Sequence, residues 1–155
     1  MGNNAAGMTV LEIILVIVLI GIFSMVVLVR TETSDVGLPS HAEILKSHLR
    51  YAQSRAMDSD TAWGIQYDGS AYRLFNSDDP VVNRSLPGWE STTLDLSSEG
   101  ISIQGGGFLV SFDSWGRPCG DNAGQNPLPR DLVLTLQKDT ESRSVTITRN
   151  TGFIP

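Results

Sequence analysis

The chain begins with a long apolar stretch. From Met8 to Val29 almost every residue is apolar, Glu12 is the single charged residue, and Arg30 ends the stretch. A helix of this length would extend about 33 Å at about 1.5 Å per residue, and the hydrocarbon core of a bilayer is about 30 Å thick. We therefore expect residues 8–30 to form a transmembrane helix. A charged residue inside such a helix costs about 2.5–3.5 kcal/mol and usually has a function, which makes Glu12 a candidate functional residue.

A second helical pattern follows a break. Residues 31–39 contain Gly37 and Pro39, so the first helix should end or kink there. Ser40 and Glu43 then have the spacing of a capping box, which predicts a helix from about residue 40 to residue 58. Apolar residues recur in this segment every three or four positions, as expected for a helix that packs on a sheet. These residues are Ala42, Leu45, Leu49, Ala52 and Ala56.

Beyond residue 60 the apolar positions alternate, which predicts strands. Asp68-Gly69 between two such segments predicts a hairpin with a type I′ turn. The predicted strands are 62–67 with 71–75, 92–96 paired with 100–104, 108–112, and 132–136 paired with 145–147 across a loop at 138–142. Residues 76–91 and 114–130 should form surface loops. The expected fold is α+β: a transmembrane helix, then an amphipathic helix packed on antiparallel β-sheet.

Charge and cysteine content narrow the possible functions. The 155 residues carry a formal net charge of −6, and an acidic domain is a poor ligand for nucleic acid. Cys119 is the only cysteine, so no disulfide can form within the chain. We expect this thiol to be buried, and a disulfide between two chains is the alternative.

The sequence contains no recognisable enzyme motif, so we expect neither catalysis nor a cofactor. Gly105-Gly106-Gly107 lies between two predicted strands, where a turn or bulge is expected rather than a nucleotide site. His41 and His48 share a helix face but lack further metal ligands, so solvated or rim positions are expected. Asp78 and Asp79, with Asn76 and Asn83, have no recognisable calcium-binding order. Trp63, Trp89 and Trp115 could form a carbohydrate or partner surface, although Trp63 should belong to the core.

The residues around Gly7 resemble the class III signal of type IV prepilins and pseudopilins. Gly7 stands just before the apolar stretch, and Glu12 is the fifth residue after it. The resemblance implies that a prepilin peptidase cuts after Gly7, that Met8 becomes the N-methylated first residue, and that residues 1–7 are a leader. It also implies that Glu12 pairs with the terminal amine of a neighbouring subunit during assembly. This leader has no Lys or Arg, whereas leaders in the family usually do.

Three later segments resemble the GspH/FimT family of minor pseudopilins and minor pilins. They are Leu49-Arg50-Tyr51-Ala52-Gln53-Ser54-Arg55-Ala56-Met57, Val110 to Arg117 and Ser144 to Phe153. In the family the last segment usually ends Thr-Gly-Arg, and here Phe153 replaces the arginine. The resemblance implies a pilin-like fold with a periplasmic domain at 40–155, anchored in the bacterial inner membrane. It further implies contacts with other pseudopilins or pilins and with the inner-membrane assembly platform.

The leading functional hypothesis is therefore a minor pseudopilin in type II protein secretion. A minor pilin of a type IV or mannose-sensitive-haemagglutinin pilus is the alternative within the same class. A competence-type DNA receptor would need a basic face, which the net charge argues against. A membrane-anchored binding domain that never polymerises would have no use for Glu12.

Overall fold

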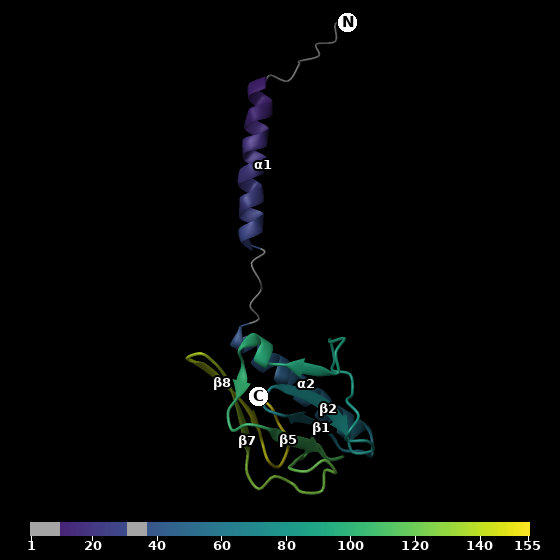
Figure 1. Ribbon diagram of the computed structural model, residues 1–155. Helices are drawn as coiled ribbons and strands as arrows, with labels where there is room; N and C mark the ends of the chain where they lie inside the picture. The colour runs from purple at the N-terminus through teal and green to yellow at the C-terminus, as the bar shows by residue number, and fades with distance from the viewer. Residues whose placement is uncertain (1–9, 31–36) are drawn as a thin grey trace, which may run out of the picture. The chain divides into compact units, whose positions relative to one another are not determined.

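The computed structural model describes residues 10–30 and 37–155, with side chains described for 10–22 and 37–155. The chain divides into two compact units, Met1–Asp35 and Val36–Pro155 (Figure 1). The first unit contains helix α1 (Val10–Arg30), with Glu12 in its first turn. Among the residues whose side chains are described, 10–22 and 37–155, no helix is both long and apolar enough to span a membrane. The predicted leader 1–7, Met8 and most of the junction 31–39 lie outside the described residues.

The second unit begins with helix α2 (Leu38–Asp58), which starts two residues earlier than predicted. Gly37 occupies the N-cap and Pro39 lies in the first turn, where its fixed φ suits the helix and its missing N–H is not needed. Ser40 therefore lies inside the helix, no side chain caps it, and the capping-box prediction is wrong. The predicted end at Asp58 is confirmed, and Ser59 donates to the carbonyl of Arg55 from both its backbone N–H and its hydroxyl.

A five-stranded antiparallel sheet has the order β3-β2-β1-β5-β6. Its strands are β1 (Trp63–Tyr67), β2 (Ala71–Asn76), β3 (Thr93–Asp95), β5 (Phe108–Phe112) and β6 (Pro118–Cys119). The hairpin between β1 and β2 is confirmed, but its turn is not type I′. Asp68 pairs with Ala71, and of the turn residues only Gly69 has a positive φ. The Asp68 carboxylate accepts from the backbone N–H groups of Ser70 and Ala71, and these side-chain hydrogen bonds stabilise the turn.

A second, three-stranded sheet has the order β4-β7-β8. Its strands are β4 (Ser102–Ile103), β7 (Leu132–Lys138) and β8 (Glu141–Ile147). The pairing predicted between 92–96 and 100–104 is wrong, because β3 pairs with β2 and β4 pairs with β7. The 3₁₀ turn η1 (Ser97–Glu99) and Gly100, at φ 68°, carry the chain from one sheet to the other. This crossing buries all four apolar residues of the two strands and their flanks in one core, namely Leu94, Leu96, Ile101 and Ile103.

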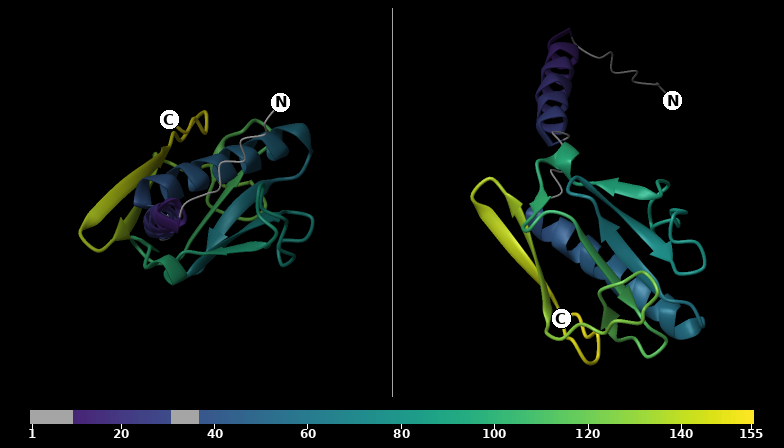
Figure 2. Two further views of the ribbon diagram at one scale, coloured as in Figure 1. Left: turned by 90° about the horizontal axis from the view of Figure 1, so that it is seen from above. Right: turned by 60° about the horizontal axis from the view of Figure 1, so that its bottom comes forward.

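Helix α2 joins the two sheets. It packs against β1 and β5 of the larger sheet and against β7 and β8 of the smaller one, and Figure 2 shows it running between them. The predicted apolar stripe is confirmed, since Ala42, Leu45, Leu49, Ala52 and Ala56 are at most 5% exposed. The members of the hydrophobic core cluster all lie between Leu38 and Ile154. This unit therefore has a hydrophobic core of its own, and the predicted α+β class with a helix on antiparallel sheet is confirmed.

Candidate functional site at the C-terminal corner

The three segments that suggested a pilin relationship meet at one place, which we call the C-terminal corner. It consists of the end of α2 (residues 50–57), the turn between β5 and β6 (113–117) and the turn after β8 (151–154). The side-chain amide of Gln53 donates to the carbonyl of Gly116 at 2.8 Å and to that of Thr151 at 3.0 Å. The Arg50 guanidinium donates to the carbonyl of Ile154, at 2.8 Å from Nη2. Two side chains of α2 thus hold both turns against the helix.

Two glycines allow this close approach. Gly116 and Gly152 have φ values of 76° and 64°, in the left-handed region that glycine adopts most easily. A Cβ on Gly152 would overlap the carbonyl oxygen of Gly116 and the amide nitrogen of Gln53. A Cβ on Gly116 would lie 2.9 Å from the sulfur of Met57. The glycines of the second and third family segments are therefore packing positions rather than parts of a binding loop.

Asp113 fixes the turn between β5 and β6. Its side chain is nearly buried, and Oδ1 accepts from the N–H groups of Trp115 and Arg117 at 3.0 and 2.8 Å. Its Oδ2 accepts from Arg117 Nε at 2.7 Å, and Gly116 N–H bonds the Asp113 carbonyl. Because these bonds occupy the carboxylate within the fold, it has a structural role rather than a catalytic one.

Large apolar side chains project from this rigid frame into solvent. Trp115 is 77% exposed, Phe153 62% and Met57 59%, and they come from three different segments of the chain. Clusters of exposed apolar side chains on a well-ordered backbone are typical of protein contact surfaces, and tryptophan is enriched among the residues that dominate them. From the sequence, Trp115 was a candidate for a partner surface, and Phe153 was noted because it replaces the arginine that is usual in the family. It gave no sign that Met57 would lie beside them, because that proximity depends on how α2 docks.

The other candidate site at the start of the chain can be placed only in part. Glu12 is an exposed residue in the first turn of α1. Gly7 and Met8 lie outside the described residues.

Both histidines are buried, so the prediction of solvated or rim positions is wrong. His41 is 5% exposed and His48 is 1% exposed. The His48 ring lies in a polar bridge, with Nδ1 2.8 Å from the hydroxyl of Tyr72 and Nε2 3.2 Å from the carbonyl of Pro87. Across residues 10–22 and 37–155, no group of three or more histidine, cysteine, aspartate or glutamate side chains could hold a metal ion.

The remaining candidates have structural explanations. Asp78 and Asp79 are exposed, while the side-chain oxygens of Asn76 and Asn83 accept from Arg84 and Arg73. These amide oxygens are used by arginine side chains within the loop, so they stabilise the loop and are not directed at a metal ion. Cys119 is fully buried, as predicted, and burial, with the nearby carboxylates of Asp113 and Asp121 adding to it, raises the pKa of this thiol to about 11.

The tryptophans divide between core and surface. Trp63 is 9% exposed, which confirms its predicted core position, and its ring lies under the Arg55 guanidinium at 5.0 Å. Gly105 and Gly106 both have positive φ in the turn between β4 and β5, as predicted for this glycine run.

Comparison with known proteins places this domain in a family. Residues 41–152 match the family model described as Type II transport protein GspH. Two crystal forms of the type IV minor pilin FimU of Pseudomonas aeruginosa have a similar fold, with TM-scores of 0.52 and 0.51 at 18% sequence identity. The alignments cover 76% of this chain and 86% and 90% of FimU. No curated protein sequence matches the chain.

Proposed function

Because this chain belongs to the type II transport protein GspH family, we propose that it is a minor pseudopilin of type II protein secretion. In this role it is a structural subunit of the pseudopilus. The observation that carries the proposal is the extent of the family match, which runs from the start of α2 to the turn after β8. The alternative is a minor pilin of a type IV pilus or of the mannose-sensitive-haemagglutinin type, since FimU, whose fold is similar, is a type IV minor pilin.

The proposal includes an anchor in the bacterial inner membrane. Residues 8–30 would form the membrane helix, with Arg30 at its end, and the domain from residue 40 onward would lie in the periplasm. The support is the apolar sequence from Met8 to Val29, which has the length that a bilayer requires. A prepilin peptidase and the inner-membrane assembly platform are the partners that this arrangement needs.

Neighbouring subunits of the filament are the proposed partners of the C-terminal corner. Its exposed apolar side chains, Met57, Trp115 and Phe153, stand on a frame fixed by hydrogen bonds and two glycines. A preordered frame lowers the entropy lost on binding, so more of the contact energy remains for association.

A DNA receptor is disfavoured by the arrangement of the basic residues. The Arg149 guanidinium donates to the carbonyl of Pro129 and its backbone N–H bonds the Asp131 carboxylate, while Arg50 is bonded to the carbonyl of Ile154. The two other arginines of the corner, Arg55 and Arg117, form ion pairs with Asp58 and Asp113. Few arginines are therefore available for phosphate contacts, and any binding should disappear as the salt concentration rises. A salt-resistant gel shift that Arg149→Ala abolishes would favour the DNA receptor instead.

The proposal is tested by following the full-length protein through processing and assembly. Mass spectrometry of the membrane-extracted protein should find an N-terminus at Met8 that carries one added methyl group. Gly7→Leu should retain the leader, because a bulky side chain next to the scissile bond obstructs the peptidase. Mature protein that starts at Met1 or beyond Val29 would contradict the assignment.

A second arm of the experiment distinguishes the two assembly systems. The protein should enter the fibre fraction of cells that contain the type II secretion platform and should be lost from that fraction when the platform is deleted. Loss only on deletion of a type IV pilus platform would identify it as a minor pilin.

A further inference from the structure

A buried polar bridge connects three separate parts of the domain. His48 lies on α2, Tyr72 lies on β2, and Pro87 belongs to the segment between β2 and β3, residues 77–92. His48 Nδ1 is 2.8 Å from the Tyr72 hydroxyl, and His48 Nε2 is 3.2 Å from the Pro87 carbonyl oxygen. His48 and Tyr72 are each 1% exposed, and their rings meet edge to face with centroids 5.7 Å apart.

The chemistry of the three groups allows one neutral arrangement of protons. The Pro87 carbonyl can only accept, so Nε2 must carry the hydrogen and donate to it. Nδ1 of the neutral ring is then an acceptor, and the Tyr72 hydroxyl donates to it. Adding a second proton to the ring would make Nδ1 a donor, so the Tyr72 hydroxyl would have to rotate and accept instead of donate, and it would place a positive charge in the core. Protonation of His48 therefore takes away the acceptor of the Tyr72 hydroxyl and buries a charge, so the bridge is most stable while His48 is neutral.

No countercharge compensates for protonation of this ring. Burial lowers the pKa of His48, and the Pro87 carbonyl offsets this only in part. Burial also raises the pKa of Tyr72, so its hydroxyl stays neutral. The neighbouring elements carry His41 on α2, Arg73 on β2, Asp95 on β3 and Arg84 and Glu90 on segment 77–92. None of these, nor any other charged group in the described part of the domain, forms an ion pair with His48.

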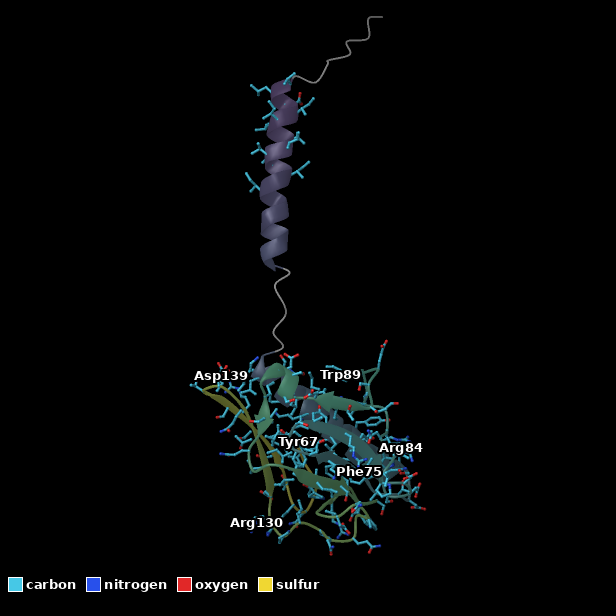
Figure 3. All side chains as sticks on the ribbon, in the orientation of Figure 1. Tyr67, Phe75, Arg84, Trp89, Arg130 and Asp139 are labelled. Atoms are coloured by element: carbon cyan, nitrogen blue, oxygen red, sulfur yellow. The ribbon has the colours of Figure 1, made fainter. Side chains whose placement is uncertain are left out.

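The Pro87 carbonyl, which His48 binds, belongs to a segment that also lines a surface hollow. In this segment Leu86 is 2% exposed and belongs to the core, while Trp89 is 44% exposed. The side chain of Trp89 is labelled in Figure 3. Trp89 lines a hollow of about 220 Å³ together with His41, Leu94, Asp95 and Glu99. Only Gly88 lies between the carbonyl in the bridge and the tryptophan in the hollow, so release of Pro87 would move a wall of the hollow.

We propose that the bridge of His48, Tyr72 and Pro87 is a pH-sensitive latch that fixes the part of segment 77–92 from Leu86 to Trp89 on the domain. Neutral His48 keeps the latch closed, and protonation opens it, which frees Leu86 and Trp89 and reshapes the hollow. The latch is a property of the domain itself and does not depend on the filament assignment. Because the pKa of His48 is lowered by folding, the stabilisation is complete above the unfolded value of about 6.5. It declines as the pH falls below that value.

Hydrogen exchange on the full-length protein in detergent micelles tests the latch. Peptides that cover residues 80–92, corrected for intrinsic exchange rates, should show an opening equilibrium that rises up to about fivefold between about pH 6.5 and pH 5.5, the limit for one proton and an open-state pKa of about 6.5. In His48→Gln, which cannot be protonated in this range, the same peptides should show no such rise. His41→Gln alters the other histidine of the chain, which also lines the hollow, and it should keep the wild-type response because His48 alone is the proposed sensor.

Nitrogen-15 labelling of the histidines supplies an independent measurement. Only two histidines are present, so the spectra of wild type and His41→Gln assign the signals of His48. The expected result is the Nε2–H tautomer, with an apparent pKa below about 6.5. The Nδ1–H tautomer, an apparent pKa at or above that value, or the same pH-dependent opening in His48→Gln would each overturn the proposal.

Discussion

Gly152 and Gly100 have nearly the same backbone conformation but very different surroundings. Their φ values are 64° and 68°, yet a Cβ on Gly152 would strike the Gly116 carbonyl and the Gln53 amide, whereas a Cβ on Gly100 would meet nothing within 4 Å. We therefore predict that Gly100→Ala lowers the free energy of unfolding by about 1 kcal/mol, because alanine is strained in the left-handed backbone conformation. Gly152→Ala should cost roughly 3 kcal/mol or more, because the steric overlap adds to that strain.

Urea unfolding of the two variants measures this difference. Both variants lose stability because alanine is strained at a positive φ. The additional loss in the free energy of unfolding of Gly152→Ala therefore measures the close packing of the C-terminal corner. Equal destabilisation by the two substitutions would show that the corner can relax and that the close contact of Gln53, Gly116 and Gly152 is not needed for stability.

Individual residues were predictable from the sequence when burial alone decided their place. Trp63 is buried as expected from its place in a predicted strand, and Cys119 as expected for a single cysteine without a disulfide partner, although it lies in strand β6 where a surface loop was predicted. His48 was placed wrongly because its two partners, Tyr72 and Pro87, are 24 and 39 positions away in the chain. No local pattern reports such a pairing, and without it a polar side chain is expected at the surface.

Elements were predictable in position but not in pairing. The alternating pattern located β3 and β4, yet it assigned them to each other, whereas the chain crosses between sheets at η1 and Gly100. Neighbouring strands in the sequence usually pair, so the pattern favoured a hairpin. The preference for pairing with the neighbouring strand does not hold here, because β3 pairs with the longer strand β2 and β4 with the longer strand β7, both of which line the core. The helix boundary failed in a similar way, since Pro39 at the first turn outweighed Ser40 as a start signal.

The C-terminal corner gives a prediction at the level of elements, because α2, the turn after β5 and the turn after β8 each supply one exposed apolar side chain. The double variant Trp115→Ala with Phe153→Ala should lower incorporation into filaments by about thirtyfold, since large apolar residues at contact surfaces often contribute about 1 kcal/mol or more each, about 2 kcal/mol for the pair. The free energy of unfolding should change by no more than about 0.5 kcal/mol, because both side chains are mostly exposed.

Trp89→Ala is the matched control, since Trp89 is also exposed but lies outside the corner. Fibre fractions from cells that express each variant at equal levels provide the measurement. Normal incorporation of the double variant, or an equal loss with Trp89→Ala, would remove the corner from the list of subunit contacts.

At the scale of the whole molecule, the sequence pattern predicted the fold class of the second unit but not the tertiary contacts within it. The periodicity of three to four in α2 and of two beyond it was sufficient for an α+β domain with a helix on antiparallel sheet. The family segments identified the site only indirectly, because Gln53, Asp113 and Gly152 proved to be structural. Their convergence creates the exposed surface, and that convergence depends on tertiary contacts between residues about 60 and 100 positions apart.

Glu12 connects the first unit to the proposed assembly of the whole molecule. Its carboxylate lies in the first turn of α1, within a segment that is otherwise apolar. A carboxylate in such a helix should be retained only if it meets a cation in the assembled filament, and the methylated amine of a neighbouring Met8 is the proposed partner. Glu12→Ala should therefore insert into the membrane more easily, by about 2.5–3.5 kcal/mol on insertion scales, and yet enter filaments about tenfold less well.

Two controls separate assembly from processing in this experiment. Ile17→Ala shortens another exposed side chain of α1 and should leave incorporation unchanged. Glu12→Gln keeps the shape of the side chain without its charge and should resemble Glu12→Ala if the ion pair is what matters. Mass spectrometry should show that all three variants are cleaved after Gly7, because the changes lie away from the scissile bond. If Glu12→Ala enters filaments at the wild-type level, the charge is dispensable, and the apolar helix alone must account for assembly.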